Sequence, residues 1–212
     1  MRRTKAIRAG QAGFTLYELM LVLAIVGVGV ALAIPNMREF LWNNRLTSVA
    51  NDLLTAVHRA RSESVKRHAQ TIMCFSADPQ AAQPPCNGNG TQGWVIFADT
   101  DGDGQADAGE DVVLRHGAIP TAVTLKSTPA GNAGYLAFNS AGFARDIALG
   151  ADLAGVVFCD KRGNKAAATP AGAGAVYSTA RAVSITATGR PKVTRIQGDI
   201  AGGDPNLAGC AP

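Results

Sequence analysis

The sequence is poor in charged and aromatic residues. Charged residues make up 17% of its 212 positions and aromatic residues 6%, against 47% hydrophobic residues and 24 glycines. The hydrophobic share excludes a wholly disordered chain, and the length excludes a large multidomain enzyme. Few aromatics among many small residues favour short strands and turns over a bulky core.

Patterns typical of catalysis and of zinc binding are also missing. None of the four cysteines lies in a C-x-x-C pair, which argues against a zinc or thioredoxin-type site. No Ser/His/Asp, Cys/His or paired-carboxylate constellation stands out, and we expect His58, His68 and His116 to be solvated helix or loop residues. The sequence therefore predicts a protein that is not an enzyme and has no cofactor, with calcium as the one candidate, considered below.

A long apolar run follows a short basic leader. Residues 1–13 carry four basic side chains and no acid, and residues 14–34 carry one charged side chain, Glu18. A helix of 21 residues is about 30 Å long, the thickness of a bilayer core. A secretory signal peptide shares these features, but this run is longer than a typical signal core and no small-residue cleavage site follows it. We therefore expect a transmembrane helix over residues 14–35.

Glu18 needs a partner, because a carboxylate inside a membrane helix is costly. Cleavage between Gly13 and Phe14 would create an α-amino group with the right charge to pair with it. Within one helix the geometry is awkward, since Glu18 lies a full turn beyond that terminus. Pairing between neighbouring copies displaced along a shared axis is easier. A plain membrane anchor does not account for Glu18, whereas a helix that packs against copies of itself does.

The residues around this acid resemble a known signal. Residues 13–19, GFTLYEL, stand between a basic leader and an apolar helix, and this order resembles the class III signal of type IV pilins and type II secretion pseudopilins. The resemblance implies that a prepilin peptidase cuts after Gly13 and N-methylates Phe14. It also implies that Glu18 guides docking of the subunit onto other pilin or pseudopilin subunits in the inner membrane. Tyr17 stands where a branched aliphatic residue is commoner, and we expect no effect on cleavage.

A second helical pattern follows Pro35. One apolar stripe recurs at spacings of three or four residues and comprises Leu46, Val49, Leu53, Val57, Ala60 and Ser64. The helix is therefore predicted to end near His68. The chain divides into a leader (1–13), a transmembrane and filament-core helix (14–35), an amphipathic helix (36–69) and a globular β domain (70–212).

The rest of the chain predicts short strands separated by Gly, Pro, Asn and Asp, without helices between them, which indicates antiparallel sheet. The predicted strands are Thr71–Ser76, Gly93–Ala98, Val112–Arg115, Ala122–Lys126, Tyr135–Asn139, Gly155–Cys159, Ala182–Thr186 and Lys192–Ile196. The fold class is therefore α+β: a long N-terminal helix, half transmembrane and half amphipathic, packed on a small antiparallel β domain.

This order of elements resembles the GspH/FimT branch of the minor pilins. The likeness is carried by residues 93–99, 101–104, 109–110 and 113–115, by Cys159-Asp160 with Gly163, and by residues 180–183 and 188–190. It extends over essentially the whole chain and is weakest between Thr121 and Asp152 and in the final segment. It implies a pilin-like fold.

The four cysteines permit three pairings. Disulfides are expected if the globular part is translocated out of the cytoplasm. Cys74 and Cys86 enclose a loop rich in Pro, Asn and Gly, which favours a local Cys74–Cys86 bond and leaves Cys159–Cys210. The second bond would hold down a glycine-rich tail. The alternative is four buried thiols.

An acidic loop matches the spacing of an EF-hand calcium loop. Glycine at its sixth position, Gly104, allows a sharp turn, and a final glutamate can bind bidentately. Its oxygen ligands at positions 1, 3, 5, 9 and 12 are Asp99, Asp101, Asp103, Asp107 and Glu110. The flanking segments read as strands rather than helices, which favours a solvated Asp/Gly turn. Calcium binding is kept as a hypothesis.

The C-terminal part is locally basic. Gly189-Arg190-Pro191-Lys192 resembles the glycine-arginine-x-arginine element of DNA-binding FimT-type minor pilins, with Lys192 in place of the second arginine. Lysine still neutralises a phosphate but lacks the bidentate fork. The resemblance implies salt-sensitive, sequence-independent contacts to double-stranded DNA. The residues predicted to make them are Arg190, Lys192, Arg195 and Arg181. The alternative is a strand edge whose cations guard against edge pairing.

Two functions remain open on the sequence alone. The first is a minor pilin that joins or primes a type IV pilus and captures DNA during natural transformation. The second is a type II secretion pseudopilin without DNA binding. In both cases we expect a single-pass inner-membrane protein with its globular domain in the periplasm.

Overall fold

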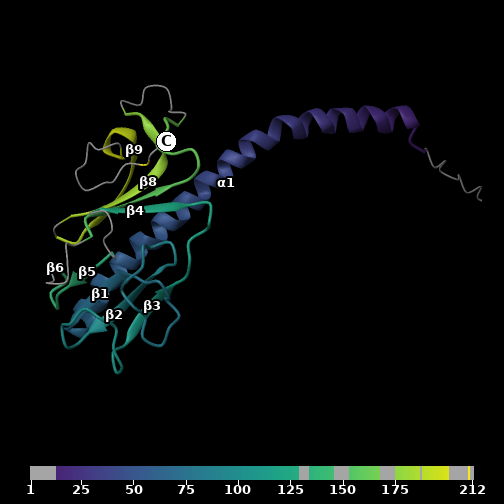
Figure 1. Ribbon diagram of the computed structural model, residues 1–212. Coiled ribbons are helices and arrows are strands. Elements are labelled where there is room, and N and C mark those ends of the chain that lie inside the picture. The colour runs from purple at the N-terminus through teal and green to yellow at the C-terminus, as the bar shows by residue number, and fades with distance from the viewer. Residues whose placement is uncertain are drawn as a thin grey trace, which may run out of the picture. The chain divides into compact units, whose positions relative to one another are not determined.

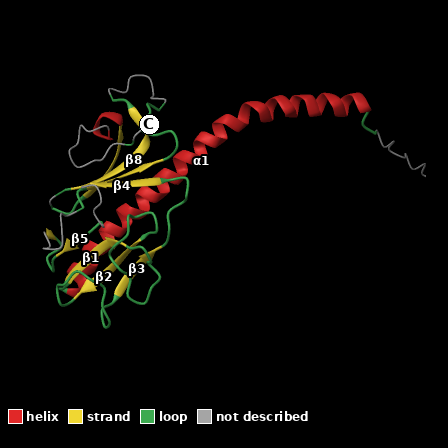
Figure 2. Ribbon diagram, viewed as in Figure 1, coloured by secondary structure: helices red, strands yellow, loops and turns green. Residues whose placement is uncertain are grey.

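The computed structural model describes residues 13–128, 134–145, 153–167, 175–186, 188–200 and 210. In these residues one long helix, α1 (Leu16–Arg67), precedes nine strands. Figures 1 and 2 show the strands gathered along the C-terminal half of α1. By contact density the chain divides into residues 1–41 and residues 42–212, and each unit is described by itself.

α1 begins with a capping box and ends at a left-handed residue. The Glu18 backbone N–H donates to the Thr15 hydroxyl at 3.2 Å, and the Thr15 N–H donates to the Glu18 carboxylate at 2.9 Å. His68 has a φ of 53°, a conformation that ends helices, so the predicted end near His68 is confirmed. The boundary predicted between residues 35 and 36 is not a break in helical structure, because α1 continues through both positions.

The part of α1 before Trp42 exposes its apolar side chains. Leu16 is 77% exposed and Leu32 is 70% exposed, although an exposed aliphatic surface of this kind is unfavourable in water. Among the described residues, α1 is the helix long and apolar enough to cross a membrane by length and composition.

The strands form two antiparallel sheets. The first has the order β3-β2-β1-β5-β6, and its strands are β1 (Gln70–Phe75), β2 (Trp94–Asp99), β3 (Val112–His116), β5 (Leu136–Phe138) and β6 (Ala144–Arg145). The second has the order β4-β7-β8-β9, and its strands are β4 (Thr124–Thr128), β7 (Gly155–Cys159), β8 (Tyr177–Ile185) and β9 (Pro191–Ile196).

One hydrophobic core joins α1 to both sheets. The helix contributes the five apolar members of the predicted stripe, Leu46, Val49, Leu53, Val57 and Ala60, and the sixth member, Ser64, is also buried. Phe75 and Trp94 enter this core from the first sheet, and Phe158 and Val183 enter it from the second. The predicted amphipathic face is therefore confirmed, and burial of each large side chain contributes roughly 1.5–3 kcal/mol.

Each sheet also buries residues on the face turned away from α1, and each of these faces carries a disulfide. Cys74 packs with Ile72, Val95 and Phe97 in one cluster, and Cys159 packs with Cys210 in another. The bonds are Cys74–Cys86 and Cys159–Cys210, with Cα–Cα distances of 5.5 and 6.1 Å. Both predicted pairings are therefore confirmed.

Two strands differ from the prediction. β8 starts at Tyr177, five residues before the predicted strand, because residues 177–179 pair with residues 165–167 instead of with β7. β6 is two residues long and was not predicted, because so short a segment has no periodicity. The other strands begin and end within two residues of their predicted bounds.

Candidate functional site

The predicted cleavage point lies just outside the helix. Gly13 and Phe14 precede α1 in non-helical backbone, and Phe14 is 90% exposed. A protease needs such an accessible, non-helical bond. Glu18 lies in the first turn of α1, where its carboxylate also accepts a hydrogen bond from the Thr15 hydroxyl at 3.0 Å.

The turn between β8 and β9 positions Arg190. Gly189 has a φ of 73°, and a Cβ at this position would clash with the ring of Phe138. The Gly189 N–H donates to the Thr186 carbonyl at 2.7 Å, and the Arg190 N–H donates to the Thr186 hydroxyl at 3.1 Å. Only glycine fits this close approach. Arg190, the next residue of the turn, is exposed at the surface.

The predicted DNA-binding residues lie on β8, in the β8–β9 turn and on β9, and they are divided between the two faces of the sheet. Lys192 pairs with Ser184 and shares the outer face with Thr194, whereas Val193 pairs with Val183 on the face toward α1. Alternation puts Arg195 on the second of these faces, where its guanidinium lies 4.8 Å from the Tyr177 ring. Five residues at about 3.3 Å each separate Arg190 from Arg195 by roughly 16 Å. Arg190 and Lys192 therefore form one exposed pair, and Arg195 stands apart from it.

Arg181 is not part of an exposed strip, and its predicted role as a surface contact is corrected here. Its side chain is 6% exposed, because β8 turns it toward α1. Its guanidinium donates to the Thr47 hydroxyl at 3.3 Å and to the Ala180 carbonyl at 2.9 Å. Burial, and then the charges of Arg195 and Arg162, lower the pKa of Arg181 to about 10.

Sequence reasoning missed Trp42, which lies beside two basic residues of the loop after β7. Lys161 Nζ is 4.5 Å from the centre of the Trp42 ring, and the Arg162 guanidinium is 5.2 Å from it. Arg162 also donates to both oxygens of Asp160 and to the Asn43 side chain at 3.1 Å. The available signal was a tryptophan that closely follows an apolar run.

The acidic loop brings three of its five predicted ligands together. Carboxylate oxygens of Asp99, Asp101 and Asp103 lie within 4.8 Å of one another. Asp99 is buried, and burial raises its pKa, opposed by the hydrogen bond from the Gly102 N–H. Each of these carboxylates also accepts a backbone N–H of the turn.

The other two predicted ligands do not join this group in the described structure. Glu110 accepts hydrogen bonds from the Thr100 N–H at 2.6 Å and from the Asp107 N–H at 3.2 Å. Its carboxylate therefore holds the loop closed, whereas the glutamate at this position of an EF-hand binds the calcium ion bidentately. The flanks are β2 and β3, so the loop joins two strands of a hairpin.

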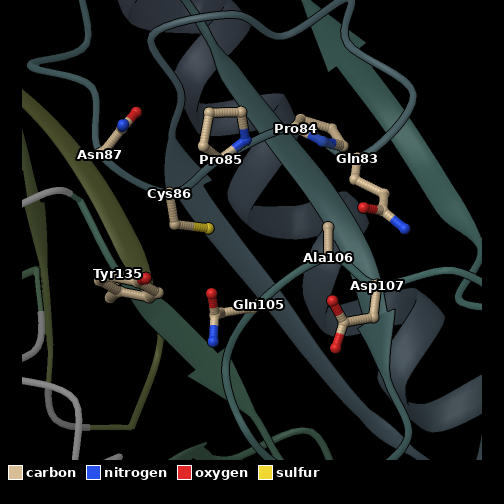
Figure 3. A pocket seen from close by; sticks show the side chains of 9 residues that line it. All are labelled: Gln83, Pro84, Pro85, Cys86, Asn87, Gln105, Ala106, Asp107 and Tyr135. Atoms are coloured by element: carbon tan, nitrogen blue, oxygen red, sulfur yellow. The ribbon is translucent and has the colours of Figure 1, made fainter.

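Asp107 lies beside a surface cavity of about 390 Å³. The cavity lies between the loop closed by the Cys74–Cys86 disulfide and the acidic loop, and Figure 3 shows its lining. The lining residues are Gln83, Pro84, Pro85, Cys86, Asn87, Gln105, Ala106, Asp107 and Tyr135. No basic residue is among them.

Comparisons with known proteins agree with these features. The family model described as type II transport protein GspH matches residues 49–189, more than half of the chain. The model described as the prokaryotic N-terminal methylation motif matches residues 8–34. The helix, the two sheets and the methylation motif together define a pilin-like protein. The chain belongs to the GspH/FimT family of minor pilins and pseudopilins.

Individual relatives resemble the chain over part of its length or at low sequence identity. The chain is similar to the pilin-like protein PilA1 of Thermus thermophilus, with 35% identity over 107 residues. This match covers 49% of the chain and 58% of PilA1, so the chain spans less than two thirds of that relative. It is also similar to two crystal structures of the type IV minor pilin FimU of Pseudomonas aeruginosa. Their TM-scores are 0.44 and 0.41 and their identities 18% and 17%, over 73% and 70% of this chain and 91% of each FimU chain.

Proposed function

We propose that this chain is a minor pilin that joins or primes a type IV pilus. A prepilin peptidase removes residues 1–13 and N-methylates Phe14, residues 14–35 anchor the chain in the inner membrane, and residues 70–212 lie in the periplasm. The observation that carries this proposal is the methylation motif over residues 8–34, in which Gly13-Phe14 stands directly before an exposed apolar helix. The two disulfides fit an oxidising compartment.

Glu18 is the assembly residue in this proposal. In the single chain its carboxylate caps the first turn of α1 through Thr15. In the filament it exchanges this neutral partner for the α-amino group of Phe14 on a neighbouring subunit, and a charged partner stabilises a carboxylate in lipid better. Glu18→Gln keeps the capping hydrogen bonds to Thr15 but loses the charge. We therefore expect Glu18→Gln to anchor normally and to be missing from purified filaments.

The competing function within the family is a type II secretion pseudopilin, which the GspH description favours. A deletion strain separates the two. Loss of surface pili with normal export of secreted enzymes is expected for the pilin. Loss of export with normal pili would instead establish the pseudopilin.

DNA capture is proposed for the exposed pair Arg190 and Lys192, with Arg195 further along β9. Two exposed cations on one hairpin can neutralise phosphates of one duplex. The plot of log association constant against log salt concentration becomes less steep by roughly 0.9 for each phosphate contact removed. We expect Arg190→Ala plus Lys192→Ala to weaken gel-shift of duplex DNA by the full chain in detergent. Lys161→Ala plus Lys165→Ala removes the same charge elsewhere and is the matched control. An equal loss in both variants, or none in either, would contradict specific capture by the hairpin.

Calcium is proposed for the three converging carboxylates, Asp99, Asp101 and Asp103. They offer hard oxygen ligands, which calcium prefers. Isothermal titration with millimolar calcium should give heat that Asp101→Asn plus Asp103→Asn abolishes. No heat with the unaltered chain would remove calcium from the account.

A further inference from the structure

Five residues form a cationic and aromatic cluster in which only Arg195 is used by the functions proposed above. This group, named the Trp42 cluster below, comprises Trp42, Lys161, Arg162, Arg181 and Arg195. Lys161 and Arg162 cover the Trp42 ring. Arg181 and Arg195 lie on the adjacent strands β8 and β9, on the sheet face toward α1, and the charges of Arg162 and Arg195 contribute to the lowered pKa of Arg181.

The Trp42 cluster carries more positive than negative charge. Arg162 Nη2 is 2.6 Å from Asp160 Oδ2, and Arg162 Nε lies 3.1 Å from the other oxygen, so this carboxylate is already engaged. The hydrogen-bond partners that the structure describes for Arg181 are the Thr47 hydroxyl and backbone carbonyls, which are neutral. Lys161 and Arg195 are exposed. A buried guanidinium with neutral partners, beside three further cations, indicates a surface that attracts an anion.

The place of Trp42 in the chain favours a lipid phosphate as that anion. Trp42 is the seventh residue after Pro35, and seven helical residues rise about 10 Å. The headgroup layers extend about 5–7 Å beyond the roughly 30 Å apolar core, so Trp42 lies at their outer edge on an upright helix and closer to them on a tilted one; tryptophan is enriched in these layers. Lysine and arginine next to a membrane helix are attracted to anionic lipids. Arg190 and Lys192, at the other end of β9, have no such neighbouring tryptophan among the described contacts.

We propose that the Trp42 cluster binds the phosphate groups of anionic phospholipids in the leaflet beside the globular domain. This proposal rests on the membrane anchor proposed above. Lys161 and Arg195 neutralise the headgroups, Trp42 inserts its indole among them, and buried Arg181 adds charge behind them. The contact orients the unassembled subunit on the membrane, and the subunit gives it up when it enters a filament. Because the charges are near the surface, salt weakens the contact.

The test uses the full chain in vesicles, with Trp42 as a fluorescent probe. The sequence has two tryptophans, and Trp94 is fully buried, so Trp94→Phe leaves Trp42 as the single reporter. Circular dichroism of Trp94→Phe checks that the variant is folded. The measurement is quenching of Trp42 by a headgroup spin label in phosphatidylcholine vesicles with and without phosphatidylglycerol. Flotation of the vesicles reports the anchor separately, so failure of the anchor and failure of the lipid contact give different results.

We expect stronger quenching with phosphatidylglycerol, and its loss at high salt. Lys161→Glu plus Arg195→Glu removes the two exposed cations of the cluster and should lower the ratio of docked to free domain by about fivefold for each cation lost. Arg190→Glu plus Lys192→Glu changes the net charge equally and is the matched control, expected to keep the quenching.

Three results would overturn the proposal. The first is equal quenching in vesicles with and without phosphatidylglycerol, in samples that float normally. The second is the same loss in both double variants, which would make net charge the cause. The third is a response of Trp42 to duplex DNA or to inorganic phosphate in neutral vesicles without a response to phosphatidylglycerol, which would make the ligand a different anion.

Discussion

Glu63 is a buried acid near the C-terminal end of α1, and it forms ion pairs with three basic residues of that helix. It is 6% exposed and lies 3.2 Å from Arg59, 3.3 Å from Lys66 and 3.1 Å from Arg67. The hydrogen bond from Arg67 is the main reason that its pKa is lowered. Arg67 in turn lies 2.7 Å from Asp111, so this group ties the end of α1 to the loop before β3.

Glu63→Gln is expected to destabilise the fold at neutral pH but not in acid. A carboxyl whose pKa is lowered on folding stabilises the folded chain above its unfolded pKa, about 4.3. That contribution is lost as the pH falls through the lower, folded pKa. We expect a loss of about 1 kcal/mol at pH 7, measured by urea unfolding, that vanishes in acid. A penalty of the same size at both pH values would show that packing, not charge, is responsible.

Arg181 shows where residue-level reading of a sequence fails. Its positive charge and its neighbours in a basic stretch predicted an exposed contact. The alternation of side chains along β8 instead turns it toward α1, where it donates hydrogen bonds to the Thr47 hydroxyl and to a backbone carbonyl. The register of β8 decides this, and a bulge shifts that register between Tyr177 and Ala182. Gly189, by contrast, belongs to the Gly-Arg-x-Lys element that is visible in the sequence. In the structure only glycine fits its left-handed, crowded position.

At the scale of elements, α1 is stabilised by its buried stripe. Leu53 is fully buried in the core that α1 shares with both sheets, so Leu53→Ala should cost about 2–5 kcal/mol in the free energy of unfolding. Val65 lies on the same helix and is 44% exposed. Val65→Ala is therefore the matched control and should cost less than about 1 kcal/mol. Denaturant unfolding of both variants measures the difference, and similar losses would contradict this placement of the core.

The two disulfides constrain chains of different length. Cys74–Cys86 spans 12 residues and Cys159–Cys210 spans 51. By loop-closure entropy, replacing the first pair by serine should cost about 3 kcal/mol and replacing the second about 4 kcal/mol. Thermal unfolding of the two double variants tests the order. A larger loss from the shorter loop would mean that local packing of Cys74 outweighs chain entropy.

Most elements could be predicted because local patterns determine them. The stripe from Leu46 to Ser64 has helical spacing, and β7 has the predicted bounds, Gly155–Cys159. The early part of β8 could not be predicted, because residues 165–167 with which it pairs lie in an Ala/Gly-rich stretch without strand pattern. The EF-hand spacing identified the three carboxylates that meet. Glu110 lies apart from these three in the described structure, because its carboxylate accepts backbone N–H groups of the loop between β2 and β3.

At the scale of the whole molecule, the chain combines an exposed apolar helical segment with a folded domain. Described residues before Trp42 expose large aliphatic side chains, whereas most large apolar side chains from Trp42 onward are buried, in the core shared with α1 and in the clusters on the outer sheet faces. Membership of the GspH/FimT family and the methylation motif join these two parts in one kind of subunit. The proposed processing of the N-terminus links them, because it supplies the charge that Glu18 needs in lipid.

Intact-mass spectrometry of the chain, extracted from membranes of cells that contain a prepilin peptidase, measures this processing directly. We predict a polypeptide that begins at an N-methylated Phe14, and a full-length chain when the peptidase gene is deleted. A polypeptide that still begins at Met1 in peptidase-positive cells, or one cut at a bond other than Gly13–Phe14, would contradict the account.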